Sequence, residues 1–157
     1  MTFGELLDKA VSLFLGQTRN KEFKLESEKD IQALVFHHAV VLAQQVGLPL
    51  KIHAEPTRID RKPDLVLGED EAFVEIKLSK SGTGGYTQAL VKWREDIDKL
   101  RAYKANWLNA RCIFFAVDES GYHSSPNSKS FFDPQVLSLR GTWTQLGPDS
   151  YYLLAEI

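Results

Sequence analysis

The stretch RKPDLVLGEDEAFVEIKL, from Arg61 to Leu78, decides how the sheet of this chain is built. Its hydrophobic pattern predicts two strands, Pro63–Leu67 and Ala72–Leu78, joined by a four-residue turn at Gly68–Glu71. The turn is short enough to bring the two strands back alongside each other. We therefore expect an antiparallel hairpin at this point of the sequence.

The register of this hairpin brings acidic residues together. If Leu67 pairs with Ala72, Asp64 lies opposite Glu75, and side chains opposed in this way have Cβ atoms about 4.5–5.5 Å apart. Two carboxylates this close repel each other unless a proton or a cation lies between them. Lys77 follows Glu75 by two and points to the same side. The other face is apolar throughout: Leu65, Leu67, Val74, Ile76 and Leu78.

The motif Pro63-Asp64, ten intervening residues, then Glu75-Ile76-Lys77 resembles the PD-(D/E)XK nuclease superfamily. Two other segments, Glu22–Lys24 and Asp60–Lys62, match the second half of this motif by accident, but neither follows an opposed acid on a strand. The resemblance implies an α/β, restriction-endonuclease-like fold with an αβββαβ core over about residues 27–119. This core would be a mixed sheet flanked by helices, with an extra N-terminal helix and a C-terminal β-hairpin.

The resemblance also implies a metal site. Asp64, Glu75 and the backbone carbonyl of Ile76 would bind Mg²⁺ or Mn²⁺, hard cations that prefer oxygen ligands. Lys77 would stabilise the transition state or orient the attacking water, and two neighbouring acids should keep it protonated. Glu28 stands where the first core helix of the superfamily often offers a glutamate. The helix dipole alone favours a glutamate in a first helical turn, and this simpler explanation takes precedence over a site role for Glu28.

The long helix expected over Tyr86–Asn106 supplies further candidates. Part of the superfamily carries a glutamine on this helix followed four residues later by a tyrosine. Gln88 matches the glutamine and is a candidate catalytic residue, whereas Lys92 replaces the tyrosine and leaves the subfamily open. Lys80, Lys92 and Lys99 are candidates for binding nucleic-acid phosphates, although a solvated helix face would carry such lysines too.

Composition and charge bound the remaining interpretation. The 157 residues suit a single domain spanning 1–157, and 43% hydrophobic residues are ordinary for a globular protein. No stretch approaches the length of a membrane span, so we expect a cytoplasmic protein. Cys112 lies in an apolar strand and should be an inert buried thiol. The net charge is −2, but Lys77–Lys104 holds seven basic against three acidic residues, beside the acidic hairpin.

The other elements follow from periodicity and from capping residues. The loop Ser81–Gly85 lacks the Lys-Ser/Thr ending of a phosphate-binding loop, so we interpret it as a flexible connector. Helices are expected from Phe3 to Gly16 and from Ser27 to Val46. Further elements are expected at Leu50–Pro56, Arg111–Val117, Phe131–Leu139, Thr142–Leu146 and Ser150–Ile157, the last two as a hairpin.

These observations lead to one principal hypothesis and two alternatives. The first is a metal-dependent nuclease that hydrolyses phosphodiester bonds in nucleic acid, with DNA preferred over RNA, because the superfamily consists chiefly of DNA endonucleases. An RNA-cleaving toxin or defence nuclease is the second. The third is a catalytically inactive nucleic-acid-binding module of the same fold. A homodimer is a further hypothesis, because cutting both strands generally needs two sites and the first helix has an apolar face.

Overall fold

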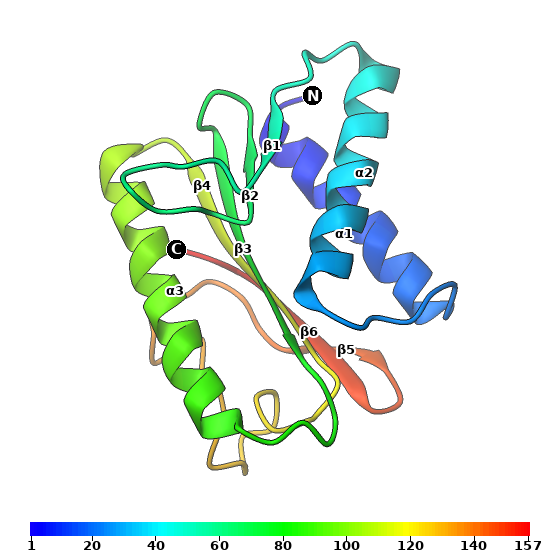
Figure 1. Cartoon of the computed structure of the whole chain (residues 1–157), viewed down its shortest axis with the longest axis vertical. Coiled ribbons are helices and arrows are strands. Elements are labelled where there is room, and N and C mark those ends of the chain that lie inside the picture. Colours follow the sequence, from blue (N-terminus) through cyan, green and yellow to red (C-terminus); the bar gives the residue numbers. More distant parts are fainter.

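A computed structural model describes all 157 residues as one mixed sheet with helices on both faces (Figure 1). The helices are α1 (Phe3–Arg19), α2 (Glu28–Val46) and α3 (Tyr86–Asn106). The strands are β1 (Ile52–Ala54), β2 (Leu65–Leu67), β3 (Ala72–Ser79), β4 (Arg111–Asp118), β5 (Thr144–Gly147) and β6 (Ser150–Glu156). Helices α1 and α2 cover one face, and α3 covers the other. The α/β class expected from the sequence is confirmed.

The strand order is β1-β2-β3-β4-β6-β5. Strands β1, β2 and β3 form an antiparallel meander, and β4 returns parallel to β3 after the crossover helix α3. The expected pairing of Leu67 with Ala72 is confirmed. The C-terminal hairpin is also present, and its strand β6 pairs antiparallel with β4, so the hairpin extends the same sheet. No helix or strand forms over Phe131–Leu139, where an element was expected.

The helix boundaries follow from local chemistry. The amide of Thr2 donates to the Glu5 carboxylate at 2.7 Å, and the amide of Glu5 donates to the Thr2 hydroxyl, as in a capping box. Helix α1 continues past Gly16 to Arg19, because a glycine weakens a helix without necessarily ending it. Helix α2 ends where Gly47 takes a left-handed conformation with φ of 72°.

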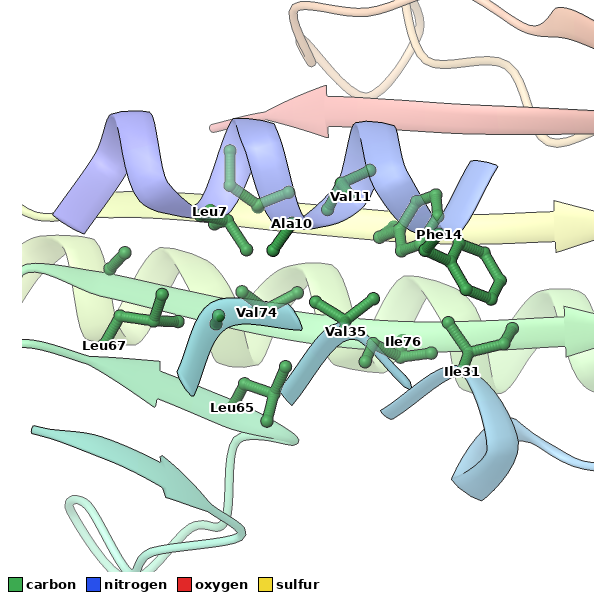
Figure 2. Close-up of a cluster of buried hydrophobic side chains, with 14 of the residues drawn as sticks. Leu7, Ala10, Val11, Phe14, Ile31, Val35, Leu65, Leu67, Val74 and Ile76 are labelled. Atoms are coloured by element: carbon green, nitrogen blue, oxygen red, sulfur yellow. The ribbon is translucent and has the colours of Figure 1, made fainter. Parts of the chain in front are cut away.

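The core on the α1–α2 side fixes the orientation of the hairpin. Leu65, Leu67, Val74 and Ile76 point toward α1 and α2 and pack against buried residues of both helices (Figure 2). The apolar face of α1 is buried in this core, so it offers no interface to a second copy, and the homodimer hypothesis loses that argument. The residues between these apolar positions must face α3, which turns the polar side chains toward that helix.

The second core lies between the sheet and α3. Phe73 stacks on Tyr103 with ring centroids 4.8 Å apart, and Trp93 of α3 packs against Phe114. Cys112 is a free, fully buried thiol in this layer, as expected, and burial raises its pKa to about 11. None of the three helices is both long and apolar enough to cross a membrane.

We expect two glycine substitutions to have opposite effects on stability. A Cβ at Gly141 would lie 2.5 Å from the carbonyl oxygen of Leu154, which belongs to β6 and cannot swing away, so Gly141→Ala should cost about 1–3 kcal/mol. A Cβ at Gly16 would meet nothing within 4 Å, so Gly16→Ala should stabilise α1 by about 0.5–1 kcal/mol. Urea unfolding followed by circular dichroism measures both changes. Equal stabilities would contradict the close packing of Gly141 on β6.

Candidate functional site

The candidate site lies at a strand edge that β2 is too short to cover. Strand β2 has three residues and β3 has eight, so the pairing of β2 with β3 stops at Leu65 and Val74. Beyond that point, two carboxylates take the place of the missing strand. Asp64 Oδ2 accepts a hydrogen bond from the amide of Ile76 at 2.6 Å, and Glu28 Oε1 accepts one from the amide of Leu78 at 3.4 Å.

Asp64 is held in place at this edge from two directions. Its carboxylate is bound to the β3 backbone, and its own carbonyl oxygen accepts a hydrogen bond of 2.6 Å from the side chain of Gln32 in α2. Burial raises the pKa of Asp64, although the Ile76 amide and the ammonium of Lys77 act in the other direction. Asp64 is therefore a partly buried acid with one oxygen engaged by the backbone.

Glu75 points to the α3 side of the sheet and is 1% exposed. Lys99 Nζ of α3 lies 2.8 Å from Glu75 Oε1, an ion pair whose geometry does not amount to a hydrogen bond. Burial and then the nearby charge of Asp64 raise the pKa of Glu75 to about 8, with Lys99 acting against both. The influence of Asp64 on Glu75 agrees with the proximity of the two acids that the register predicts.

Lys77 shares this side of the sheet and is 14% exposed. Burial acts to lower the pKa of Lys77, but the carboxylates of Asp96 and Glu28, 3.0 and 3.7 Å from Nζ, outweigh burial and raise it. The ammonium therefore stays charged. A charged lysine can stabilise an anion, whereas it cannot accept a proton from water.

Helix α3 contributes Asp96, which sequence reasoning did not name, and Lys99, which it named only for binding nucleic acid. Asp96 contacts both lysines, with Oδ2 3.0 Å from Lys77 and Oδ1 3.2 Å from Lys99. Lys99 pairs with Glu75 and Asp96 inside the cluster, and its contact with nucleic acid stays a prediction. The spacing of Asp96 and Lys99 places them on one helix face, but only the packing of α3 shows that this face covers Glu75.

The donor set is chemically suited to a hard divalent cation. Because a strand residue directs its amide and its carbonyl to the same side, the Ile76 carbonyl points to the edge where Asp64 binds the Ile76 amide. Two carboxylates and one carbonyl are ligands that Mg²⁺ and Mn²⁺ accept. Four acids, Glu28, Asp64, Glu75 and Asp96, face the lysines Lys77 and Lys99, so negative charge remains for a cation to offset when Glu75 has lost its proton. No three of these side chains are already placed to bind one metal ion together.

The remaining candidates lie outside this cluster. Gln88 lines a surface cavity of about 730 Å³ together with Tyr86 and Lys129. It precedes Lys99 by eleven residues, which is about 16 Å along a helix, so the structure does not bring Gln88 to the acids as expected.

Lys80 donates to the carbonyl of Leu25 at 3.0 Å and pairs with Glu26.

Lys92 is the candidate that remains exposed on α3. Gln88, Lys92, Asp96 and Lys99 follow one another at intervals of four, four and three residues, so they form one polar stripe along the helix. The stripe connects the cavity at the start of α3 with the acidic cluster.

Comparisons with protein-family models, with curated proteins and with solved structures find no match to this chain.

The raised pKa of Glu75 predicts a pH dependence of stability. The folded pKa, about 8, exceeds the ordinary value of 4.5, so the folded state holds a proton that the unfolded state has lost between these values. The resulting stabilisation is complete below about pH 4.5 and is lost as the pH rises through about 8. Since one pKa unit is worth about 1.4 kcal/mol, we expect the wild type to lose about 1–3 kcal/mol more than Glu75→Gln between pH 5 and 8.5.

Chemical denaturation at a series of pH values measures this difference. Glu69→Gln is the matched control, because Glu69 is an exposed glutamate in the turn of the same hairpin. Glu69 pairs with Lys51, which lowers its pKa, so this control should lose stability between pH 5 and 8.5 by the same amount as the wild type. Parallel pH profiles of the wild type and Glu75→Gln would show that Glu75 titrates as an ordinary carboxyl group.

Proposed function

We propose that this protein is a metal-dependent nuclease that hydrolyses phosphodiester bonds, most readily in DNA. The observation that carries the proposal is the meeting of Asp64, Glu75 and Lys77 beside the part of β3 that β2 leaves unpaired, where four acids face two lysines. The order of α2, the β1-β2-β3 meander, α3 and a parallel β4 supports a restriction-endonuclease-like core. DNA is favoured over RNA by the motif alone, which resembles a superfamily chiefly of DNA endonucleases.

Each residue has a defined task in this proposal. Asp64, Glu75 and the Ile76 carbonyl hold the cation, with Glu28 as a further carboxylate at the same edge. A bound Mg²⁺ or Mn²⁺ would lower the pKa of a water molecule and neutralise charge on the phosphate. Lys77 adds a fixed positive charge for the anionic transition state, and Asp96 keeps that ammonium in position.

Access for a nucleic-acid strand is available on both sides of the cluster. Glu28, Leu78 and Lys80 border a surface cavity of about 440 Å³ beside the free edge of β3. On the other side, the polar stripe of α3 leads past Lys92 to the cavity that Gln88 lines. A backbone that crosses the acids could follow this stripe, with Lys92 meeting a phosphate next to the cut.

One observation favours the rival proposal of an inactive nucleic-acid-binding module. Glu75 already has a counter-ion in Lys99 without any metal. A protein that had lost catalysis could keep such a cluster as a structural ion-pair network. Nuclease and module differ in a simple respect, because only the nuclease cuts its ligand when a metal is supplied.

We expect Mg²⁺-dependent cutting that requires the cluster. Purified protein would be incubated with plasmid, single-stranded DNA and RNA, in Mg²⁺, Mn²⁺ or EDTA, and the products separated on gels. Asp64→Asn, Glu75→Gln and Lys77→Met should each lower the rate at least about 100-fold, because each removes a metal ligand or the charge that stabilises the transition state.

Asp98→Asn is the matched control for these variants. Asp98 is an exposed acid on α3 that pairs only with Arg101 on the same helix, so this variant should cut like the wild type. Binding of nucleic acid without cutting under every metal condition would overturn the nuclease and support the module. Preference for RNA over both forms of DNA would correct the substrate.

The α3 stripe generates a separate prediction about binding. Lys92→Ala should weaken the binding of DNA and reduce the slope of log K against log[salt] by about one, as expected when one phosphate contact is lost. Arg94→Ala is the matched control, because Arg94 is exposed on a different face of α3 and carries the same charge. Fluorescence anisotropy with labelled DNA in Ca²⁺ at several salt concentrations measures both. Equal effects of the two variants would remove the stripe from the binding surface.

A further inference from the structure

Lys99 occupies an unusual position for a lysine near a nucleic-acid site, because its ammonium touches the acid that the proposed cation would need. Nζ lies 2.8 Å from Glu75 Oε1, and the lysine side chain is only 19% exposed. A further contact joins Nζ to the carbonyl of Lys62 at 3.4 Å. Lys99 is thus directed into the cluster, where its ammonium pairs with Glu75 and also with Asp96.

No other cation serves Glu75. Lys77 is the second ammonium in the cluster, and its ion pairs are with Asp96 and Glu28. A carboxylate that is 1% exposed is costly to keep ionised unless an opposite charge pairs with it. Lys99 therefore provides the positive charge at Glu75 that a bound cation would otherwise provide.

An ammonium and a divalent cation cannot both bind the same buried oxygen without strong repulsion. Lys99 has an alternative partner within reach, because Asp96 Oδ1 already lies 3.2 Å from Nζ. Asp96 is one turn before Lys99 on α3, so the lysine can release Glu75 by a change of side-chain rotamer while the helix stays in place. It would then pair with Asp96 alone.

We propose that Lys99 is an internal counter-ion that competes with the divalent cation for Glu75 and moves onto Asp96 when the cation binds. This inference rests on the proposed metal-dependent function and adds a residue that sets the metal affinity. In the absence of metal, Lys99 is the counter-ion of Glu75 once the Glu75 carboxyl group has lost its proton. In the presence of metal, it joins Lys77 as a second positive charge next to the substrate.

Metal affinity tests the competition directly. Isothermal titration with Mg²⁺ at pH 9, where protons compete less for Glu75, would be compared for the wild type, Lys99→Met and Lys99→Arg. We expect Lys99→Met to bind Mg²⁺ about 10-fold more tightly, because no ammonium has to be displaced, and Lys99→Arg to stay within about threefold of the wild type. Arg94→Met is the matched control, since Arg94 is an exposed cation on the same helix that pairs with none of the acids, and its Mg²⁺ affinity should stay within about threefold of the wild type.

A measurement on the wild-type chain keeps the test decisive if Lys99→Met folds poorly. The side-chain Cε–Hε signals of ¹³C-labelled lysines would be followed by NMR during the Mg²⁺ titration, with Lys99→Gln used for assignment. The Lys99 signal should shift with the same Mg²⁺ dependence as the calorimetric binding, while the Lys92 signal should not.

The outcomes separate the two proposals. Tighter binding by Lys99→Met together with a shift of the Lys99 signal supports the competition. Unchanged or weaker binding by Lys99→Met, or a Lys99 signal that does not move at saturating Mg²⁺, overturns the inference while leaving the nuclease proposal intact. If the wild type and all variants fail to bind Mg²⁺ or Mn²⁺, the metal-dependent function fails and the inference fails with it.

Discussion

The difference in length between β2 and β3 is the constraint on which the site depends. Strand β3 runs for eight residues, and β2 pairs with only the first part of it, so the backbone of Ile76 and Leu78 needs other hydrogen-bond partners on that side. Carboxylates fill the gap, because a buried amide without an acceptor is costly. The need to satisfy these backbone amides therefore gathers acids at one edge of the sheet. Their negative charge is stabilised by a nearby cation, either a lysine or a metal ion.

The two cores explain why the acids cannot turn away. Leu65, Val74 and Ile76 are held against α1 and α2, while Phe73 and Phe114 are held against α3. Any slip of one residue in β3 would exchange these faces and bury Glu75 and Lys77 among the apolar residues of α1 and α2. The packing energy of both layers thus maintains the position of the polar groups. In this fold, the hydrophobic pattern determines the geometry of the charged site.

The parts that sequence reasoning predicted are those governed by local periodicity. The register of the hairpin, the direction of Glu75 and Lys77 and the bounds of α3 all follow from alternation or from helical spacing. The contact of Asp96 and Lys99 with the acids depends on how α3 rotates against the sheet, which tertiary packing decides. Gln88 was misplaced for the same reason, since matching a helix position does not give its distance from a strand.

A purely structural role accounts for some of the acids but leaves Glu75 unexplained. Asp64 and Glu28 complete the hydrogen bonding of β3, and Asp96 holds two lysines, so each stabilises the fold where it stands. No hydrogen bond reaches Glu75 Oε1, which is buried against a single ammonium. An uncharged side chain of similar size at this position would avoid the desolvation of both ions, and such replacements are often neutral or stabilising. Glu75 therefore buries a carboxyl group beside a lysine without completing a backbone contact, and the structural role of the other acids does not account for it.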